Sequence, residues 1–422
     1  MKPSSVNLNQ GFLLLLLISS LLSRLKIPGL GIGIHFILMG TIGLAAILYN
    51  RQSFIRVVQC YPQLGIILSL FYSWIWISAF CSDWRAIAIH YTLKYSIYGI
   101  VLCALVALLG SKLQISTADK IVLSLLMIIG IGGFLEQTFP NNGLINLLSY
   151  PDSYPRIRSI IQNPNPFGVL MAISAIITLL WNRDRSYLPR QYWVYPFIIL
   201  IALSGSRNGW LVLFIGFVLV QITHQISVRL VTHIFLFFII CLLVIQPSSE
   251  RLVPQIWANL SAPQAAIAQT SSLPSANSAI LSPPPIPHSS IDDRLILWKQ
   301  ATKTALEHPI SGVGVGVFQE VFCRQIYGHS RFNTHNLFLS IWVELGIVGV
   351  FFFLLTLGIV LKIAIQGHQT LLHFIPFILF LSSQMVDYFI YEYAVTTIAL
   401  YLFVRPLILI QDRTKIASDP LQ

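Results

Sequence analysis

Charged side chains are scarce in this sequence. Asp, Glu, Lys and Arg make up 10% of the 422 residues, whereas hydrophobic residues make up 55%, and the mean hydropathy is +0.75. Soluble domains carry roughly a quarter charged residues, and so few charges cannot cover the surface of a chain of this length. The scarcity excludes a water-soluble protein and predicts an integral membrane protein.

Several chemical signatures are missing as well. The net charge of +11 is scattered between apolar runs, so nucleic acid is not an expected partner. The five cysteines lack metal-ligand spacing and are predicted to be free thiols, although Cys81 and Cys323 both face outward and could pair. No phosphate-binding loop or GxSxG motif occurs, and GVGVG at 312–316 is interpreted as a flexible turn rather than a dinucleotide fingerprint.

What the sequence does contain is a series of long apolar runs, close to the roughly 20 residues of a membrane span. The runs are continuous rather than alternating, which favours helices over barrel strands. The predicted fold is an all-α polytopic membrane protein with about twelve transmembrane helices. The expected spans are 10–23, 29–49, 59–80, 87–110, 120–138, 165–182, 191–205, 208–224, 230–246, 336–361, 371–386 and 388–410.

Twelve spans place both termini on the same side of the membrane. The short segments of that side hold twice as many Lys and Arg residues as those of the other side, so the positive-inside rule predicts cytoplasmic termini. Arg24 and Lys26 oppose this orientation in the first hairpin. Two long segments, 139–164 and 247–335, are then expected to face outward, and membrane lipids surround the spans.

Three parts are predicted along the chain. A transmembrane bundle occupies 1–190, a core occupies 191–361 and includes the outward loop 247–335, and the last helices with a short cytoplasmic tail occupy 362–422. Ser, Ala and Pro dominate about 258–290, which predicts a flexible insert. The following DDRLILWKQATKTALE predicts a helix with an apolar stripe.

A titratable ring stands at the mouth of one predicted span. His335 and Asn336 directly precede a long apolar run, and on an ideal helix Gly346 and Gly349 share the face of His335. This spacing predicts a close helix–helix contact below the ring. Glu344 falls on the opposite face, so a pair between His335 and Glu344 is not expected. The alternative role for His335 is to satisfy backbone groups where a helix begins.

Two arginines are further candidates. Arg207 separates two short apolar runs, and arginine at membrane depth needs an anion or a wet cavity unless it snorkels to the surface. Arg294 opens the predicted loop helix, whose positive end favours arginine only if an anion docks there. A salt bridge to Asp292 or Asp293 is the alternative. Arg158, on the other outward loop, is a candidate for the same anion site.

Weaker candidates complete the set. Asp387 and Glu392 lie near the last outer turn, where they could contact sugar hydroxyls. Lys94 and His35 lie within predicted spans, where they could line a cavity, but no role is assigned to them.

Four segments resemble motifs of one family. HNLFLSIWVELGIVGV, which begins at His335, fits a motif of His-Asn, nine residues and Gly-x-x-Gly-Val. SGSRNGW around Arg207, DDRLILWKQATKTALEHPISGVGVGVF and SIIQNPNPFGVL resemble three other motifs in order and spacing. Over roughly 190–360 the chain therefore resembles the O-antigen ligase and polymerase superfamily. The chain departs from the family pattern at two positions. The family has Leu where this chain has Trp298, and Gly where this chain has Asn208.

The resemblance implies a metal-independent, GT-C-like glycosyltransferase without a cofactor. Such an enzyme moves a glycan from an undecaprenyl-pyrophosphate-type donor to a hydroxyl of a lipid or glycan acceptor, on the periplasmic side of the inner membrane. Arg207 and Arg294 would bind the pyrophosphate, with Arg158 and Asn336 as further contacts. His335 would take the proton of the acceptor, and a nearby arginine would help to keep its ring neutral.

Two other activities compete with this interpretation. Some members of the superfamily have been labelled inorganic-carbon transporters, which leaves a bicarbonate or small-solute transporter open. An O-linked protein oligosaccharyltransferase has a similar membrane core. The candidate residues cluster at the outer surface, whereas transporters place polar residues near the bilayer midplane, and this favours the glycan transferase.

Overall fold

A computed structural model describes the chain over eleven segments. These are residues 5–22, 33–111, 113–138, 159–161, 163–180, 194–223, 228–245, 290–327, 333–365, 368–389 and 392–418. Arg158 and residues 258–289 of the predicted insert lie outside them.

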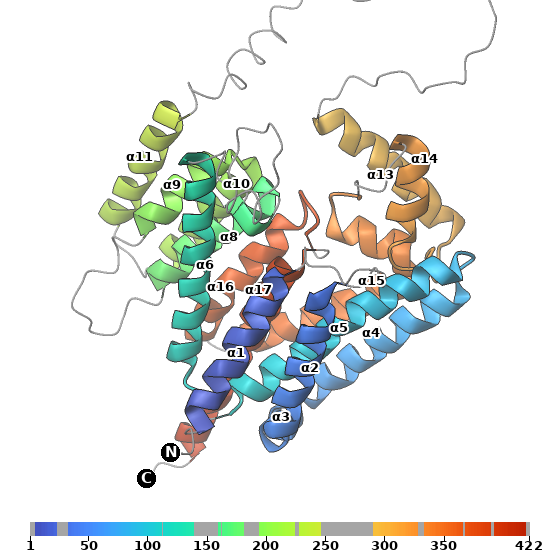
Figure 1. Cartoon of the computed structure of the whole chain (residues 1–422), viewed down its shortest axis with the longest axis horizontal. Coiled ribbons are helices and arrows are strands. Elements are labelled where there is room, and N and C mark those ends of the chain that lie inside the picture. Colours follow the sequence, from blue (N-terminus) through green and yellow to red (C-terminus); the bar gives the residue numbers. More distant parts are fainter. Residues whose placement is uncertain are drawn as a thin grey trace, which may run out of the picture.

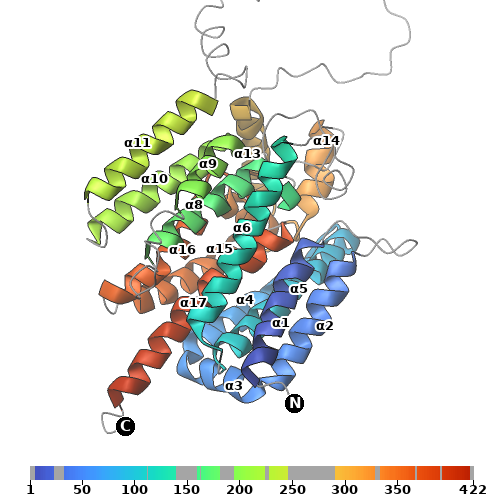
Figure 2. The same cartoon turned by 60° about the vertical axis from the view of Figure 1, so that its left-hand side comes forward.

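The described residues are almost entirely helical, and they contain no β-strand. Helices α8–α11 gather on one side of the molecule and α2–α5 on the other, with α16 and α17 between them (Figures 1 and 2). The elements are α1 (Ser5–Leu21), α2 (Ile34–Tyr49), α3 (Arg51–Cys60), α4 (Pro62–Cys81), α5 (Arg85–Leu109), α6 (Ile115–Thr138), the 3-10 turn η1 (Ser159–Ile161), α8 (Pro164–Leu180), α9 (Val194–Ser204), α10 (Arg207–Ile222), α11 (Val228–Ile245), α13 (Ser290–Glu307), the π-helical η5 (Phe318–Cys323), α14 (Arg324–Tyr327), α15 (Leu337–Ala364), α16 (His368–Ser383) and α17 (Tyr393–Ser418).

Each of the twelve predicted spans overlaps one of these helices. Within the described residues, five helices are long and apolar enough to cross a membrane, namely α4, α5, α6, α15 and α17. The bent pair α2 and α3, which meet at 82°, would add a sixth, and six further apolar helices are shorter. The all-helical, multi-pass fold is therefore confirmed, whereas twelve full-length spans are not. The sequence predicted only a connection between the second and third spans, and the structure has the helix α3 there instead.

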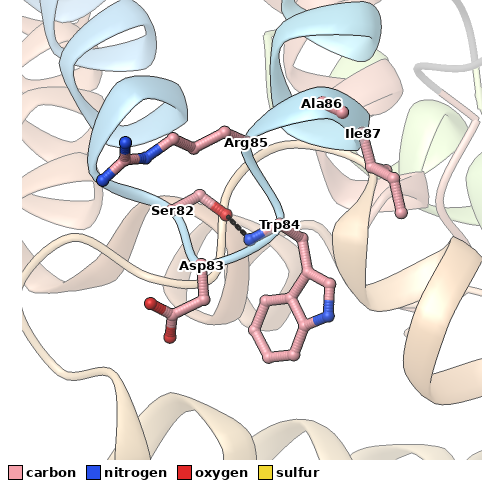
Figure 3. A pocket seen from close by; sticks show the side chains of 6 residues that line it. All are labelled: Ser82, Asp83, Trp84, Arg85, Ala86 and Ile87. Atoms are coloured by element: carbon pink, nitrogen blue, oxygen red, sulfur yellow. Dashed lines mark hydrogen bonds between the residues drawn. The ribbon is translucent and has the colours of Figure 1, made fainter.

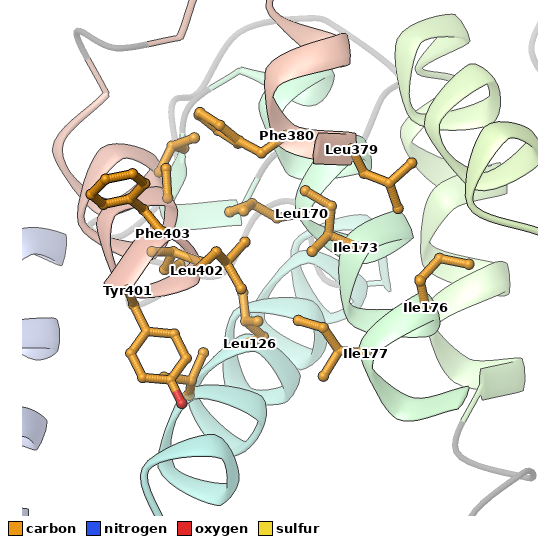
Figure 4. Close-up of a cluster of buried hydrophobic side chains, with 14 of the residues drawn as sticks. Leu126, Leu170, Ile173, Ile176, Ile177, Leu379, Phe380, Tyr401, Leu402 and Phe403 are labelled. Atoms are coloured by element: carbon orange, nitrogen blue, oxygen red, sulfur yellow. The ribbon is translucent and has the colours of Figure 1, made fainter. Parts of the chain in front are cut away.

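The largest core surrounds α8. Its residues from Pro166 to Leu179 are buried on every side, as is typical of a helix that is apolar all round and lies inside a bundle. Helices α6, α9, α10 and α16 pack around it. Figure 4 shows Leu170 and Ile173 of α8 among side chains of α6, α16 and α17. This core holds the beginning of α8 and the end of α16 in place, and both border the site described below.

Helix α15 is broken at Gly346, which has φ 66° and ψ −170°. A Cβ atom there would lie 2.0 Å from the carbonyl oxygen of Ile310, so only glycine fits. The expected helix–helix seam is therefore wrong. Gly346 admits the backbone of Ile310, from the segment before α15, rather than a neighbouring helix, and Gly349 faces the side chain of Leu345 from its own helix.

The segment 309–316 fills this break. Val313 and Gly314 donate backbone hydrogen bonds to the carbonyl groups of residues 343 and 344, and the N–H of Ile347 donates to the carbonyl of Pro309 over 2.8 Å. The N–H of Gly316 donates to the Glu344 carboxylate over 3.1 Å. The turn predicted at GVGVG is present, but these hydrogen bonds hold it in place, and the segment supplies the partners that the interrupted helix lacks.

The cysteines follow the sequence prediction, because all five are free. Cys81 is exposed at the end of α4, whereas Cys323 is buried in η5. Burial raises the pKa of the Cys323 thiol to about 12, so it remains protonated and unreactive at neutral pH.

Candidate active site

Four distant parts of the chain meet at the carboxylate of Asp387, which is 1% exposed. Nδ1 of His335 lies 2.6 Å from its Oδ1 atom. The side-chain amide of Asn165, at the start of α8, donates to Oδ2 over 2.8 Å. The guanidinium of Arg294, in the first turns of α13, lies 3.9 Å from the same oxygen. His335 and Arg294, predicted separately from sequence, are therefore brought together by Asp387.

The imidazole of His335 is held by its backbone as well as by this contact. His335 has φ 50°, which is unusual for a residue with a side chain, and its N–H donates to Oδ1 of Asn333 over 2.8 Å. Asn336 caps α15 by accepting from the N–H of Leu339, and its amide donates to the carbonyl of Met385. The predicted role of Asn336 as a substrate contact stays a prediction, and its amide fixes the turn that carries His335.

Trp298 secures the same turn from the side of α13. Its indole N–H donates to the carbonyl of Thr334 over 2.7 Å, and Thr334 is hydrogen-bonded in turn to Ser340 of α15. The backbone N–H of Leu337 donates to the carbonyl of Gln384, three residues before Asp387. Trp298, a departure from the family pattern, thus ties the helix of Arg294 to the turn of His335.

The carboxylate determines what the ring can do. A carboxylate only accepts hydrogen bonds, so a neutral His335 must carry its proton on Nδ1 and keep the lone pair on Nε2. His335 is 22% exposed by side chain, so the ring is open to a substrate. The family resemblance implied that a nearby arginine acts on the ring. The contacting charge is instead Asp387, which orients the ring and would stabilise it when protonated.

Arg207 lies at the first position of α10 and is exposed. The hydroxyl of Ser206, directly before it, caps α10 by accepting from the N–H of Gly209 and donates to the carbonyl of Asn165 over 3.3 Å. A Cβ atom on Gly209 would lie 2.8 Å from the backbone of Gly168, so α8 and α10 cross almost backbone to backbone. This crossing places the start of α10 beside the residue whose side chain binds Asp387.

Asn208 ties the same helix to the end of α16. Its side-chain amide donates to the carbonyl of Ser383 over 3.0 Å, four residues before Asp387. This contact gives a structural reason for asparagine where the family has glycine. Arg207 is the first residue of α10 and Arg294 is the fifth residue of α13, so both lie near the positive end of a helix dipole. A guanidinium at such a helix end suits an anion with several oxygen atoms.

Sequence reasoning missed the pairing that organises the site. Asp387 was expected to contact sugar hydroxyls, and Asn165 was not singled out. A carboxylate between two apolar runs costs free energy unless it has partners. The position of Asp387 between two such runs could therefore have indicated that it has partners. No sequence signal joins it to His335, which lies 52 residues away. Within the described residues, no three His, Cys, Asp or Glu side chains gather as metal ligands.

Comparison with known families bears on the same residues. Residues 193–354 match the family model described as O-antigen ligase, which spans Arg207, Arg294 and His335. Asn165 and Asp387 lie outside the matched segment. No curated protein matches the sequence. The chain therefore contains an O-antigen ligase family domain over 193–354, and the resemblance drawn from its motifs is confirmed.

Proposed function

We propose that the chain is a multi-pass glycosyltransferase of the cytoplasmic membrane. It moves a glycan from an undecaprenyl-pyrophosphate-type donor to a hydroxyl group of a lipid or glycan acceptor, as a ligase or a polymerase of surface polysaccharide. The observation that carries the proposal is the pairing of His335 with Asp387 at 2.6 Å, beside a guanidinium that is 25% exposed.

His335 is the general base in this scheme. Its Nε2 atom takes the proton of the acceptor hydroxyl while the hydroxyl oxygen bonds to the anomeric carbon of the donor sugar. Asp387 holds the ring in the required tautomer and stabilises the imidazolium that forms. The proton then passes from His335 to the departed pyrophosphate or to water, which restores the base.

The two arginines act on the leaving group. As the bond between the anomeric carbon and the phosphate oxygen breaks, negative charge grows on the polyprenyl pyrophosphate. Arg207 and Arg294 stabilise that charge by charge-assisted hydrogen bonds, a role that a metal ion fills in other enzymes. Arg294 lies 3.9 Å from Asp387, beyond hydrogen-bond distance, so this contact leaves its N–H groups available for phosphate oxygens.

The proposed topology has twelve spans with both termini in the cytoplasm. The positive-inside distribution of Lys and Arg supports it, and so do the helices found at every predicted span. His335, Arg207 and Arg294 then share the outer face of the membrane, where a lipid-linked pyrophosphate lies at headgroup level. The three-part division at 190 and 361 stays a prediction.

A transporter is the second candidate, because the break in α15 resembles the interrupted helices of that class. In transporters the freed backbone groups bind substrate or ions. Here the carbonyl groups of residues 343–345 and the N–H of Ile347 bond to protein, including the indole of Trp74 and the hydroxyl of Ser78. The break therefore supports a structural role more than transport.

The decisive experiment replaces His335 with Ala in the native host. We expect surface glycan to fall by about 10²-fold or more, the usual contribution of a general base, while the lipid-linked donor accumulates. His233→Ala on the exposed face of α11 is the matched control. Normal surface glycan at wild-type protein levels would refute the enzyme, and loss of bicarbonate uptake with intact glycan would establish the transporter. Transfer to a protein instead of a lipid or glycan would identify the oligosaccharyltransferase.

A further inference from the structure

A pocket of about 520 Å³ opens at the turn between α4 and α5, and it takes no part in the scheme above. This volume lies within the range of small-molecule sites, roughly 300–1,000 Å³. Figure 3 shows the six lining residues, which are Ser82, Asp83, Trp84, Arg85, Ala86 and Ile87.

The aromatic wall of the pocket is fixed in place. The hydroxyl of Ser82 accepts from the N–H of Trp84 over 3.0 Å and donates to the carbonyl of Val313 in the segment that fills the α15 break. The half-buried Trp84 ring meets the rings of His308 and Phe322 edge to face, with centroids 6.0 and 5.4 Å away. These partners belong to the segment after α13 and to η5, so the Trp84 ring is held by packing against protein.

The polar side chains of the pocket are of both charges. Asp83 and Arg85 are exposed on either side of Trp84, and Figure 3 shows Asp83 and Trp84 extending to the same side of the turn. A sugar ring has an apolar face that packs on an aromatic ring and an edge of hydroxyl groups that donate to a carboxylate. Asp83 and Arg85 offset each other's charge, so the lining favours a neutral, polar ligand over an anionic lipid headgroup.

The pocket and the candidate active site lie at opposite ends of α13. Trp84 contacts His308, directly after the helix, whereas Arg294 stands in its first turns. Fourteen residues separate His308 from Arg294, which corresponds to roughly 20 Å along a helix. An oligosaccharide of several units spans this distance, whereas a single sugar does not. In Figure 1, α13 lies above α4 and α5.

We propose that this pocket is a carbohydrate subsite, which holds a sugar unit remote from the bond that reacts at His335. The inference rests on the proposed function, since it assigns the pocket to the glycan of that reaction. Trp84 supplies the face on which the sugar packs, and Asp83 accepts from its hydroxyl groups. Binding of a remote unit would make transfer depend on the length of the glycan.

The test measures binding apart from transfer. The probe is the lipid-free oligosaccharide that mild acid releases from the surface polysaccharide of the native host. The full-length protein is labelled with a fluorophore on Cys81, which is exposed beside the pocket, in a Cys60→Ser background because Cys60 is also exposed. We expect Trp84→Ala to weaken binding by at least tenfold. Trp76→Ala, which removes an indole from α4 away from the pocket, should leave it unchanged.

Asp83→Asn guards against a folding defect, because Asp83 is exposed and does not pack in the core. It should weaken binding several-fold without loss of folded protein. Equal binding by the wild type, Trp84→Ala and Asp83→Asn, or no binding by the wild type, would overturn the subsite and leave Trp84 as an interfacial anchor.

His335→Ala separates this inference from the proposed function. It should bind the oligosaccharide as the wild type does while losing transfer. If His335→Ala transfers normally but binding still depends on Trp84, the catalytic proposal fails and the subsite stands.

Discussion

Two aspartates in this molecule meet an arginine, and they do so in opposite ways. Asp119 of α6 accepts from Nε of Arg405 over 2.7 Å and from its terminal nitrogen over 2.8 Å, and the hydroxyl of Tyr401 donates to it as well. Asp387 lies 3.9 Å from Arg294, and its carboxylate instead forms hydrogen bonds with His335, Asn165 and the backbone N–H of Tyr388. We call Asp119 and Arg405, which share two direct hydrogen bonds, the closed pair. We call Asp387 and Arg294, which do not touch within hydrogen-bond distance, the open pair.

The difference separates a structural ion pair from a chemical site. Arg405 is 5% exposed, and its pair with Asp119 fastens α17 to α6 inside the bundle. The side chains of Arg294 and His335 are 25% and 22% exposed, and both lie against the carboxylate of Asp387. Around the open pair, the N–H groups of Arg294 and the Nε2 lone pair of His335 can still bind a substrate. In the closed pair, the donors of Arg405 that face Asp119 are already hydrogen-bonded to it.

The largest effect should come from breaking the open cluster with Asp387→Asn. The amide keeps the shape of the side chain but can donate to Nδ1 of His335, which allows the wrong tautomer. We expect the transfer rate to fall by about 10³-fold or more while the amount of folded protein stays near wild type. Transfer by purified protein and a gel-filtration profile measure both. A rate within threefold of wild type would remove Asp387 from the mechanism.

Breaking the closed pair with Asp119→Asn should do the reverse. Removal of one member of a buried ion pair leaves the other charge uncompensated and costs about 3–5 kcal/mol of stability. We expect less folded protein and a lower unfolding temperature, but normal transfer per folded molecule. The double variant Asp119→Leu with Arg405→Met should recover much of the lost stability. A stable Asp119→Asn protein with impaired chemistry would abolish the contrast between the two pairs.

Arg294→Lys should have the smallest of the three effects and sharpen the comparison. Lysine keeps the charge but loses the planar fork that binds two phosphate oxygens at once. We expect transfer to fall by about 10-fold to 10²-fold, less than for Asp387→Asn, with most of the loss recovered at high donor concentration. Steady-state kinetics with varied donor would measure this. An unchanged dependence on donor concentration would argue against pyrophosphate binding by Arg294.

Much of the helical layout could be predicted from sequence, because each span is a local apolar run. His335 and Arg207 could be singled out because they are polar residues beside such runs, and Arg294 because it opens a predicted helix whose positive end disfavours arginine. Their assembly could not be predicted, since it depends on how distant segments cross. Projection of His335 along an ideal helix failed because α15 begins at Leu337 and breaks at Gly346.

The closed pair was missed for a different reason. Arg405 lies inside the last predicted span, and an arginine at that depth signals a partner. Its partner Asp119 is 286 residues away, directly before another span, so only the tertiary structure joins them. Trp298 is likewise a departure from a motif in the sequence, and only the structure shows that its indole holds the backbone carbonyl of Thr334, directly before His335.

The filled break in α15 has a consequence for the setting in which the protein works. His335 lies eleven residues before Gly346, and at that point the helix is hydrogen-bonded to the segment 309–316 and, through Ser78, to α4. The height of the imidazole is therefore fixed by protein contacts and not by how the apolar run matches the lipid. Bilayers with longer or shorter acyl chains should tilt the molecule as a whole and leave the geometry around Asp387 intact.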